Sequence, residues 1–325
     1  MARRSLRWRG FAVEVQFPDR AAAAARKLVG RVKPGSSSRR PLLEFPDSSP
    51  RTRLQYPATA TSSYLDDLRM IQGWFPDLWD AKKGDDDGGL AAAVERLYWY
   101  HTIELPGGLV TRGYYDHRPL VPHYGIPEDL TGKRVLDVGC WDGFWSFEFE
   151  RRGADVTAVD LDRLTQTDLP PQIREAVLSA GLEQQFGGGF ELARRALGSK
   201  VNRIVGSVYE LDPAKIGTFD LVHFSDVSLH LERPLEAFRR IRSVTAGQAM
   251  IIDSYDPSLD SESRNLTEYE GGWVGAIWWN PSLNTFAQMI VDAGFSDVRV
   301  HKTYRLNPTT AEAPGRWRAV IIATP

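Results

Sequence analysis

The chain has 325 residues, of which 42% are hydrophobic and 25% are charged, and its net charge is −2. This length is sufficient for one large core with an appendage. The absence of any run of 18 apolar residues excludes a membrane-spanning helix, and the start of the sequence lacks the apolar segment of a secretory signal.

The single cysteine, Cys140, excludes an internal disulfide and indicates a reducing compartment, so we expect a cytoplasmic protein. Cys140 lies within a glycine-rich turn, where a small residue is needed, and we expect a structural role rather than a reactive thiol. His, Asp and Glu residues do not cluster at the spacing of metal ligands, so no metal is expected.

The first forty residues are strongly basic. They hold eleven Arg or Lys residues against Glu14 and Asp19, a charge of +9, while the rest of the chain carries −11. Such a segment either contacts nucleic acid or an anionic membrane, or is simply a solvated tail. Residues 34–62 are rich in Pro, Ser and Thr, which predicts an extended arm over residues 1–62. The alternating run 11–17 could add a strand to a partner subunit, so a homo-oligomer is one outcome. The Ala- and Arg-rich composition is typical of bacterial proteins of high GC content.

Residues 63–128 are predicted to form a helical cap that contributes to the active site. Apolar residues between Leu65 and Trp74 have helical spacing, and Pro76 ends that helix. The acidic, glycine-rich stretch 84–89 predicts a loop, and a second helix is expected from Leu90 to Trp99.

Residues 129–325 are predicted to form an α/β domain. From Gly132 onward, strand and helix patterns alternate, which indicates a Rossmann-like, doubly wound sheet with helices on both faces. A helical stretch over 171–199 is interrupted at Gly187–Gly189, and a short loop predicts that the last two strands form an antiparallel hairpin. The seven expected strands are 134–138, 155–159, 202–206, 219–224, 247–252, 297–303 and 317–323.

The segment 134–147 predicts a cofactor site. It combines an apolar strand, a turn from Gly139 to Gly143, and the start of a helix, whose free N–H groups are electropositive. Asp160 follows Gly139 by twenty-one residues and ends the next apolar run, the position at which an acid binds ribose hydroxyls. The pattern indicates a cofactor that contains adenosine.

The turn favours S-adenosylmethionine over a nicotinamide or flavin dinucleotide. Trp141 stands where a dinucleotide site needs a second glycine to admit the pyrophosphate. Asp137 and Asp142 flank the turn, and their carboxylates suit an ammonium group better than a phosphate.

With these elements placed, the sequence resembles the class I S-adenosylmethionine-dependent methyltransferases, and within them the subgroup of the tRNA wobble-uridine carboxymethyltransferase and its bacterial relatives. The resemblance covers about residues 90–325 and implies the strand order 3-2-1-4-5-7-6 with a reversed seventh strand. The matching segments are 99–105, 130–139, 142–147, 206–211, 219–222, His230 before Pro234, and 278–281.

The resemblance implies that the donor lies against Gly139, with the ribose and adenine held after the second and third strands and the methionine portion after the fourth. Together with the turn and nearby aromatics, the expected cofactor residues are Trp99, Tyr115, Asp137, Gly139, Trp141, Asp142, Gly143, Asp160, Leu161, Asp162, Ser207, Val208, Tyr209 and Ser225.

The subgroup also implies a choice of donor. The tRNA enzyme binds carboxy-S-adenosylmethionine through a Lys, a Tyr and an Arg. Arg318 matches the Arg, but Leu229 stands at the Tyr position and segment 99–101 offers no Lys. A carboxylate beside Leu229 would be costly in a dry site, so ordinary S-adenosylmethionine is expected.

Methyl transfer requires placement of the acceptor and, for a hydroxyl acceptor, a general base. His230 is a candidate base because it follows the fourth strand at the expected cofactor mouth, and His101 and Asp226 are its rivals. Trp278, Trp279 and Arg318 are the candidate substrate residues.

The sequence predicts a methyltransferase acting on a small molecule, most simply by O-methylation in specialised metabolism or glycan chemistry. Two alternatives stay open: a tRNA-modifying enzyme, and an inactive domain that binds the cofactor or a partner.

Overall fold

The structure is a computed structural model that describes residues 4–8, 11–15, 58–74, 88–272, 276–309 and 315–325. The chain divides into two units, residues 1–56 and residues 57–325. In the first unit, β1 (Arg4–Trp8) pairs antiparallel with β2 (Phe11–Val15). The alternating run therefore forms a strand, and its partner here is the neighbouring strand of the same chain.

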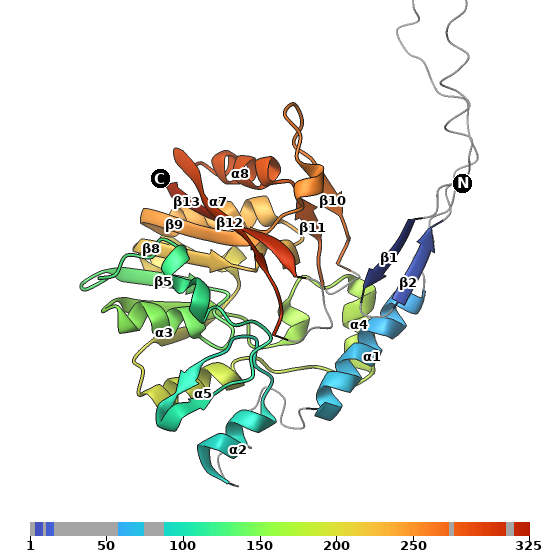
Figure 1. Cartoon of the computed structure of the whole chain (residues 1–325), viewed down its shortest axis with the longest axis horizontal. Helices are drawn as coiled ribbons and strands as arrows, with labels where there is room; N and C mark the ends of the chain where they lie inside the picture. The colour runs from blue at the N-terminus through green and yellow to red at the C-terminus, as the bar shows by residue number, and fades with distance from the viewer. Residues whose placement is uncertain (1–3, 9–10, 16–57, 75–87, 273–275, 310–314) are drawn as a thin grey trace, which may run out of the picture. The chain divides into compact units, whose positions relative to one another are not determined.

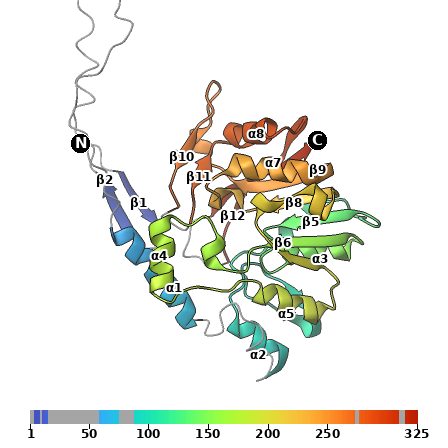
Figure 2. The ribbon, with the colours of Figure 1, turned by 180° about the vertical axis from the view of Figure 1, so that it is seen from behind.

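The second unit is built on a seven-stranded sheet, shown in Figures 1 and 2. Its order is β12-β13-β9-β8-β5-β6-β7, with β13 antiparallel to both of its neighbours and the five strands from β9 to β7 parallel. The predicted strand order and the reversed last strand are confirmed. The bounds are β5 Arg134–Val138, β6 Asp155–Asp160, β7 Asn202–Val205, β8 Phe219–Ser225, β9 Thr245–Ser254, β12 Asp297–Leu306 and β13 Arg316–Thr324.

Two apolar layers hold helices on opposite faces of this sheet. Alternate residues of a strand point to opposite faces, so Val135 packs under α3 (Phe144–Arg151) and α5 (Gly188–Leu197). Leu136 faces α7 (Pro234–Val244) and α8 (Leu283–Asp292) instead. Because both faces are covered, the central strands are apolar almost throughout.

The predicted cap contains less helix than expected. Helix α1 (Ala58–Trp74) begins before the predicted start, and it packs through Leu68 on α4 (Pro171–Ser179). Helix α2 (Gly89–Arg96) ends early, because Leu97 is extended, so Trp99 lies beyond it. The segment continues as β3 (Glu104–Leu105), η4 (Pro106–Gly108), β4 (Leu109–Val110) and η5 (Arg118–His123). The Asp85–Asp87 run of the predicted loop lies outside the described residues.

The helical stretch predicted over 171–199 is two helices, α4 and α5, separated by residues 180–187. Gly187, with a φ of 92°, is the N-cap of α5, so two of the three glycines begin a helix rather than interrupt one. The remaining elements are η6 (Leu164–Gln166), η7 (Val208–Glu210), α6 (Pro213–Ile216), η8 (Ser228–His230), η9 (Pro257–Leu259), β10 (Thr267–Tyr269) and β11 (Trp279–Pro281).

The parallel strands β5, β6, β7 and β8 have their carboxyl ends at the same edge of the sheet. This edge contains the switch point, where the connections that follow the neighbouring strands β5 and β8 lead in opposite directions along the sheet. Ligands of open α/β sheets bind at this edge. Within the described residues, no helix has the length and apolar character needed to cross a membrane.

Candidate active site

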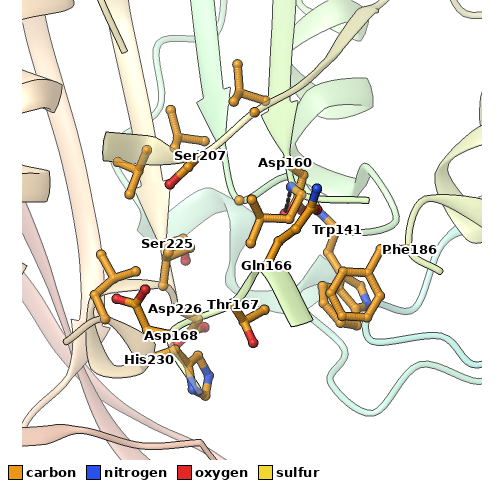
Figure 3. A pocket seen from close by; sticks show the side chains of 18 of the residues that line it. Trp141, Asp160, Gln166, Thr167, Asp168, Phe186, Ser207, Ser225, Asp226 and His230 are labelled. Carbon is orange, nitrogen blue, oxygen red and sulfur yellow. Dashed lines mark hydrogen bonds between the residues drawn. The ribbon is translucent and has the colours of Figure 1, made fainter. Parts of the chain in front are cut away.

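A cavity of about 280 Å³ lies at the carboxyl ends of these four strands. Figure 3 shows that Asp160, Ser207 and Ser225 line it from three successive strand ends. Eleven of the predicted site residues line it: His101, Gly139, Trp141, Asp160, Leu161, Ser207, Val208, Tyr209, Ser225, Asp226 and His230.

The turn after β5 forms the floor of the cavity. Gly139 has a φ of 77°, and a Cβ there would lie 2.2 Å from Cγ2 of Val227. Only glycine fits that approach. Trp141 also has a left-handed conformation, with a φ of 47°, and its ring lies 5.0 Å from that of Phe186. The contacts of Gly139 with Val227 and of Trp141 with Phe186 therefore fix the conformation of the turn.

Asp160 joins the ends of β5 and β6. Its carboxylate accepts hydrogen bonds from the N–H groups of Trp141, at 2.6 Å, and Leu161, at 2.8 Å. Burial raises the pKa of Asp160 to about 6, although these two bonds and Arg203 favour the charged form. Each carboxylate oxygen keeps a lone pair for a further donor. A ribose hydroxyl pair fits that arrangement.

The next wall is apolar and suits a planar ring. It contains Val159, Leu161 and Val208. Tyr209 contributes its ring, while its hydroxyl donates to Oδ2 of Asp168 at 2.5 Å. Asp168 Oδ2 also accepts from the N–H of Glu232, so this one side chain links the loops after three strands.

At the far end of the cavity, Asp226 has a strained backbone, with a φ of 53°. Its carboxylate lies 2.5 Å from Nε of Arg318, whose side chain is buried. Burial disfavours the charged guanidinium, but Asp226, together with Tyr100, Tyr115 and Asp253, more than offsets burial and raises the pKa of Arg318. Arg318 therefore stays charged and paired, and it does not line the cavity itself.

His230 is oriented by a backbone carbonyl. Its Nδ1 lies 2.9 Å from the oxygen of Ala276, which can only accept, so Nδ1 carries the proton and Nε2 keeps its lone pair. Burial lowers the pKa of His230, so the ring is neutral at neutral pH.

His101 is oriented by a carboxylate. Nδ1 of His101 lies 2.5 Å from Oδ1 of Asp142, and Oδ2 of Asp142 accepts from the N–H groups of Tyr100 and His101. Asp142 is buried and uses both carboxylate oxygens in these bonds, and it does not line the cavity.

The other predicted site residues lie outside the lining of this cavity. Asp137 is buried and bonded to Ser146 and His223. The ring nitrogen of Trp99 donates to the oxygen of Val94, and that of Trp278 donates to the oxygen of Asp168. Tyr115 lies 5.8 Å from the guanidinium of Arg318. Gly143 and Asp162 also lie outside it, and Trp279 lines a different cavity.

Several lining residues were not predicted. They include Leu164, Gln166, Thr167, Asp168 and Phe186, which come from the loops that follow β6 and α4. No short motif marks them in the sequence. The three glycines after Phe186 were the one available signal of a close approach.

The model of a family described as methyltransferase domain matches residues 115–300, more than half of the chain. A tRNA U34 carboxymethyltransferase of Pseudomonas putida is 27% identical over 173 residues, 53% of this chain and 48% of that protein. A magnesium-protoporphyrin O-methyltransferase of Rhodobacter capsulatus is 46% identical over 56 residues, 16% of this chain and 25% of that protein. The chain thus spans about half of the first relative's length and a quarter of the second's.

Among solved structures, the N-terminal domain of EvdMO1, crystallised with S-adenosylhomocysteine and D-fucose, aligns with a TM-score of 0.47. The alignment covers 82% of this chain and 99% of that one, at 15% identity. The family match, the sheet order and a cavity lined by an acid at the second strand end agree. The chain therefore belongs to the class I S-adenosylmethionine-dependent methyltransferases, and its cofactor is S-adenosylmethionine.

Proposed function

We propose that this enzyme transfers a methyl group to a hydroxyl of a neutral small molecule. The observation that carries the proposal is the charge of the donor cavity. Among the described residues, its lining contains Asp160, Asp168 and Asp226 but no Lys or Arg. Such a lining suits a cationic sulfonium and an uncharged acceptor, whereas a polyanionic acceptor needs cations to offset its phosphates.

The donor would be held by the residues around the turn. Asp160 would accept the ribose hydroxyls, Val208 and Tyr209 would flank the adenine, and Ser225 would face the methionine portion. When bound, S-adenosylmethionine supplies a methyl group that is already activated on its sulfonium. The chain then needs to orient the acceptor and to accept its proton.

His230 and His101 are both suited to accept that proton. Each has its Nδ1 bonded to an oxygen, which leaves its Nε2 as the ring nitrogen that can face an acceptor hydroxyl. Asp226, the third candidate, already uses its carboxylate to pair with Arg318. We therefore propose that Asp226 neutralises the charge of Arg318 at the acceptor end of the cavity.

A tRNA acceptor is the second candidate. The basic residues 1–40 and the printed name of the Pseudomonas putida relative favour it. It is ranked lower because Arg318, the buried cation nearest the acceptor end, is neutralised within the protein.

The acceptor class is tested with donor labelled in its methyl group, offered with either a panel of phenols and sugar alcohols or total tRNA. We expect label in the small molecules and none in the tRNA. With an accepted small molecule, replacing the catalytic histidine by Gln should lower turnover by about 10²–10⁴-fold. His230→Gln and His101→Gln are compared for this, and affinity for S-adenosylhomocysteine should stay within about threefold. Label in tRNA, bound with a steep salt dependence, would place the second candidate first.

Donor binding should depend on pH through Asp160. Its pKa of about 6 lies above the ordinary value, so the side chain is protonated below pH 6 and loses acceptor capacity for the ribose. Affinity for S-adenosylhomocysteine should be constant from pH 7 to 8 and fall by up to about tenfold per unit below 6.

Asp160→Asn is the matched control for this titration. It should weaken binding at pH 8 by about 1–3 kcal/mol and remove most of the pH dependence. A wild-type dissociation constant that does not change between pH 5 and 8 would contradict the assigned role.

Donor choice should follow from the Asp226–Arg318 pair. Because Asp226 neutralises Arg318, carboxy-S-adenosylmethionine should bind no better than S-adenosylmethionine in competition calorimetry. Asp226→Asn should shift the ratio toward the carboxylated donor by about tenfold, or about 1.4 kcal/mol. Arg318→Met leaves the Asp226 carboxylate unpaired and should shift the ratio away from the carboxylated donor. A wild-type preference of tenfold or more for the carboxylated donor would overturn this expectation.

A further inference from the structure

A second cavity, of about 330 Å³, lies between η8, the start of α7, the β10–β11 hairpin and α8. Figures 1 and 2 show α7, α8, β10 and β11 side by side, and η8 contacts α7 and β11. The volume of the second cavity is within the size range of small-molecule sites. Its apolar wall consists of Leu229, Leu235, Phe238, Trp279, Phe286 and Met289.

The polar groups around this cavity are largely engaged elsewhere. Ser228 donates its hydroxyl hydrogen to Asp253 at 2.6 Å, and the ring nitrogen of Trp279 donates to the oxygen of Glu232. At the rim, Arg233 pairs with Glu236 and covers the ring of Tyr209. Ser254 is the exception: its hydroxyl is buried, it lines the cavity, and it has no hydrogen-bond partner among the described residues. One neutral polar group of a ligand can pair with it, while the Arg233–Glu236 pair at the rim offers no unpaired charge.

One wall is an aromatic surface held in place. The hydrogen bond to Glu232 fixes the Trp279 ring, which is half-buried. Tyr269, 57% exposed, lies 4.9 Å from it and extends the aromatic surface outward. A fixed, partly exposed tryptophan beside an apolar cavity favours a planar ring.

The cavity is separate from the donor site. The two share the η8 turn, with Val227 and His230 facing the donor cavity and Leu229 facing the second one. The N–H of Trp278 donates to the oxygen of Leu229 at 2.8 Å, which attaches the hairpin to this turn. Donor binding therefore leaves the second cavity free.

We propose that this second cavity binds a neutral small molecule through a planar apolar ring system, independently of the methyl donor. Walls from four elements enclose the ring, and the aromatic pair Trp279–Tyr269 sets its orientation.

The test uses 2-naphthol, titrated by calorimetry into protein saturated with S-adenosylhomocysteine. We expect binding in the sub-millimolar range, as a ligand of this size allows. Met289→Trp fills the cavity and should weaken binding at least about tenfold, and Trp279→Ala should weaken it about tenfold. Val291→Trp, on an exposed position of the same helix, is the matched control and should bind as wild type.

Absence of binding, or equal binding by wild type and both cavity variants, would overturn the proposal. So would loss of 2-naphthol binding once S-adenosylhomocysteine is present, because the probe would then occupy the donor cavity. Trp279→Ala removes bulk and keeps the test readable if Met289→Trp does not fold. Both variants should keep affinity for S-adenosylhomocysteine within about threefold. A wild type that does not bind that ligand would contradict the methyltransferase function and leave the naphthol result standing alone.

Discussion

The hydrogen bond from the N–H of Trp141 to Asp160 ties together the two strand ends on which the donor site rests. It holds a turn in which Gly139 and Trp141 both have left-handed backbones, and it brings a buried carboxylate to the switch point of the sheet. The conformation of the turn is costly, and tight packing of Gly139 against Val227 and of Trp141 against Phe186 offsets that cost. The same bond leaves the acid able to accept a ribose.

The charged groups around the cavity suit the positive charge of the donor's sulfonium. The cavity contains carboxylates and histidines, while a buried cation behind it, Arg318, is neutralised by Asp226. Burying an unpaired guanidinium would be strongly unfavourable, so Asp226 stabilises the fold as well as setting the charge of the site. The acceptor end thus has no net positive charge, which is the physical basis for proposing a neutral acceptor.

The sequence predicted the structure best in segments whose residue types allow few backbone conformations. Central strands such as Arg134–Val138 are apolar on both faces, and the turn beginning at Gly139 has few alternatives, so both could be predicted. Asp160 followed from its distance to that turn. The cap was harder, because Leu97 ends α2 by tertiary packing rather than by a breaker residue.

The direction in which a side chain points was also difficult to predict from the sequence. Asp137 and Asp142 flank the turn in sequence, yet both point into buried pairs, with His223 and His101. Residues such as Asp168 and Phe186 reach the cavity from long loops, whose course depends on contacts far apart in the chain. Sequence spacing alone does not encode such contacts.

The cavity suits S-adenosylmethionine and not a dinucleotide. Calorimetric titration of the wild-type protein with S-adenosylhomocysteine and, separately, with NAD tests this preference most directly. The site predicts saturable binding of S-adenosylhomocysteine and binding of NAD at least about tenfold weaker, since the Trp141 side of the turn crowds a pyrophosphate. Tighter binding of NAD would contradict the account.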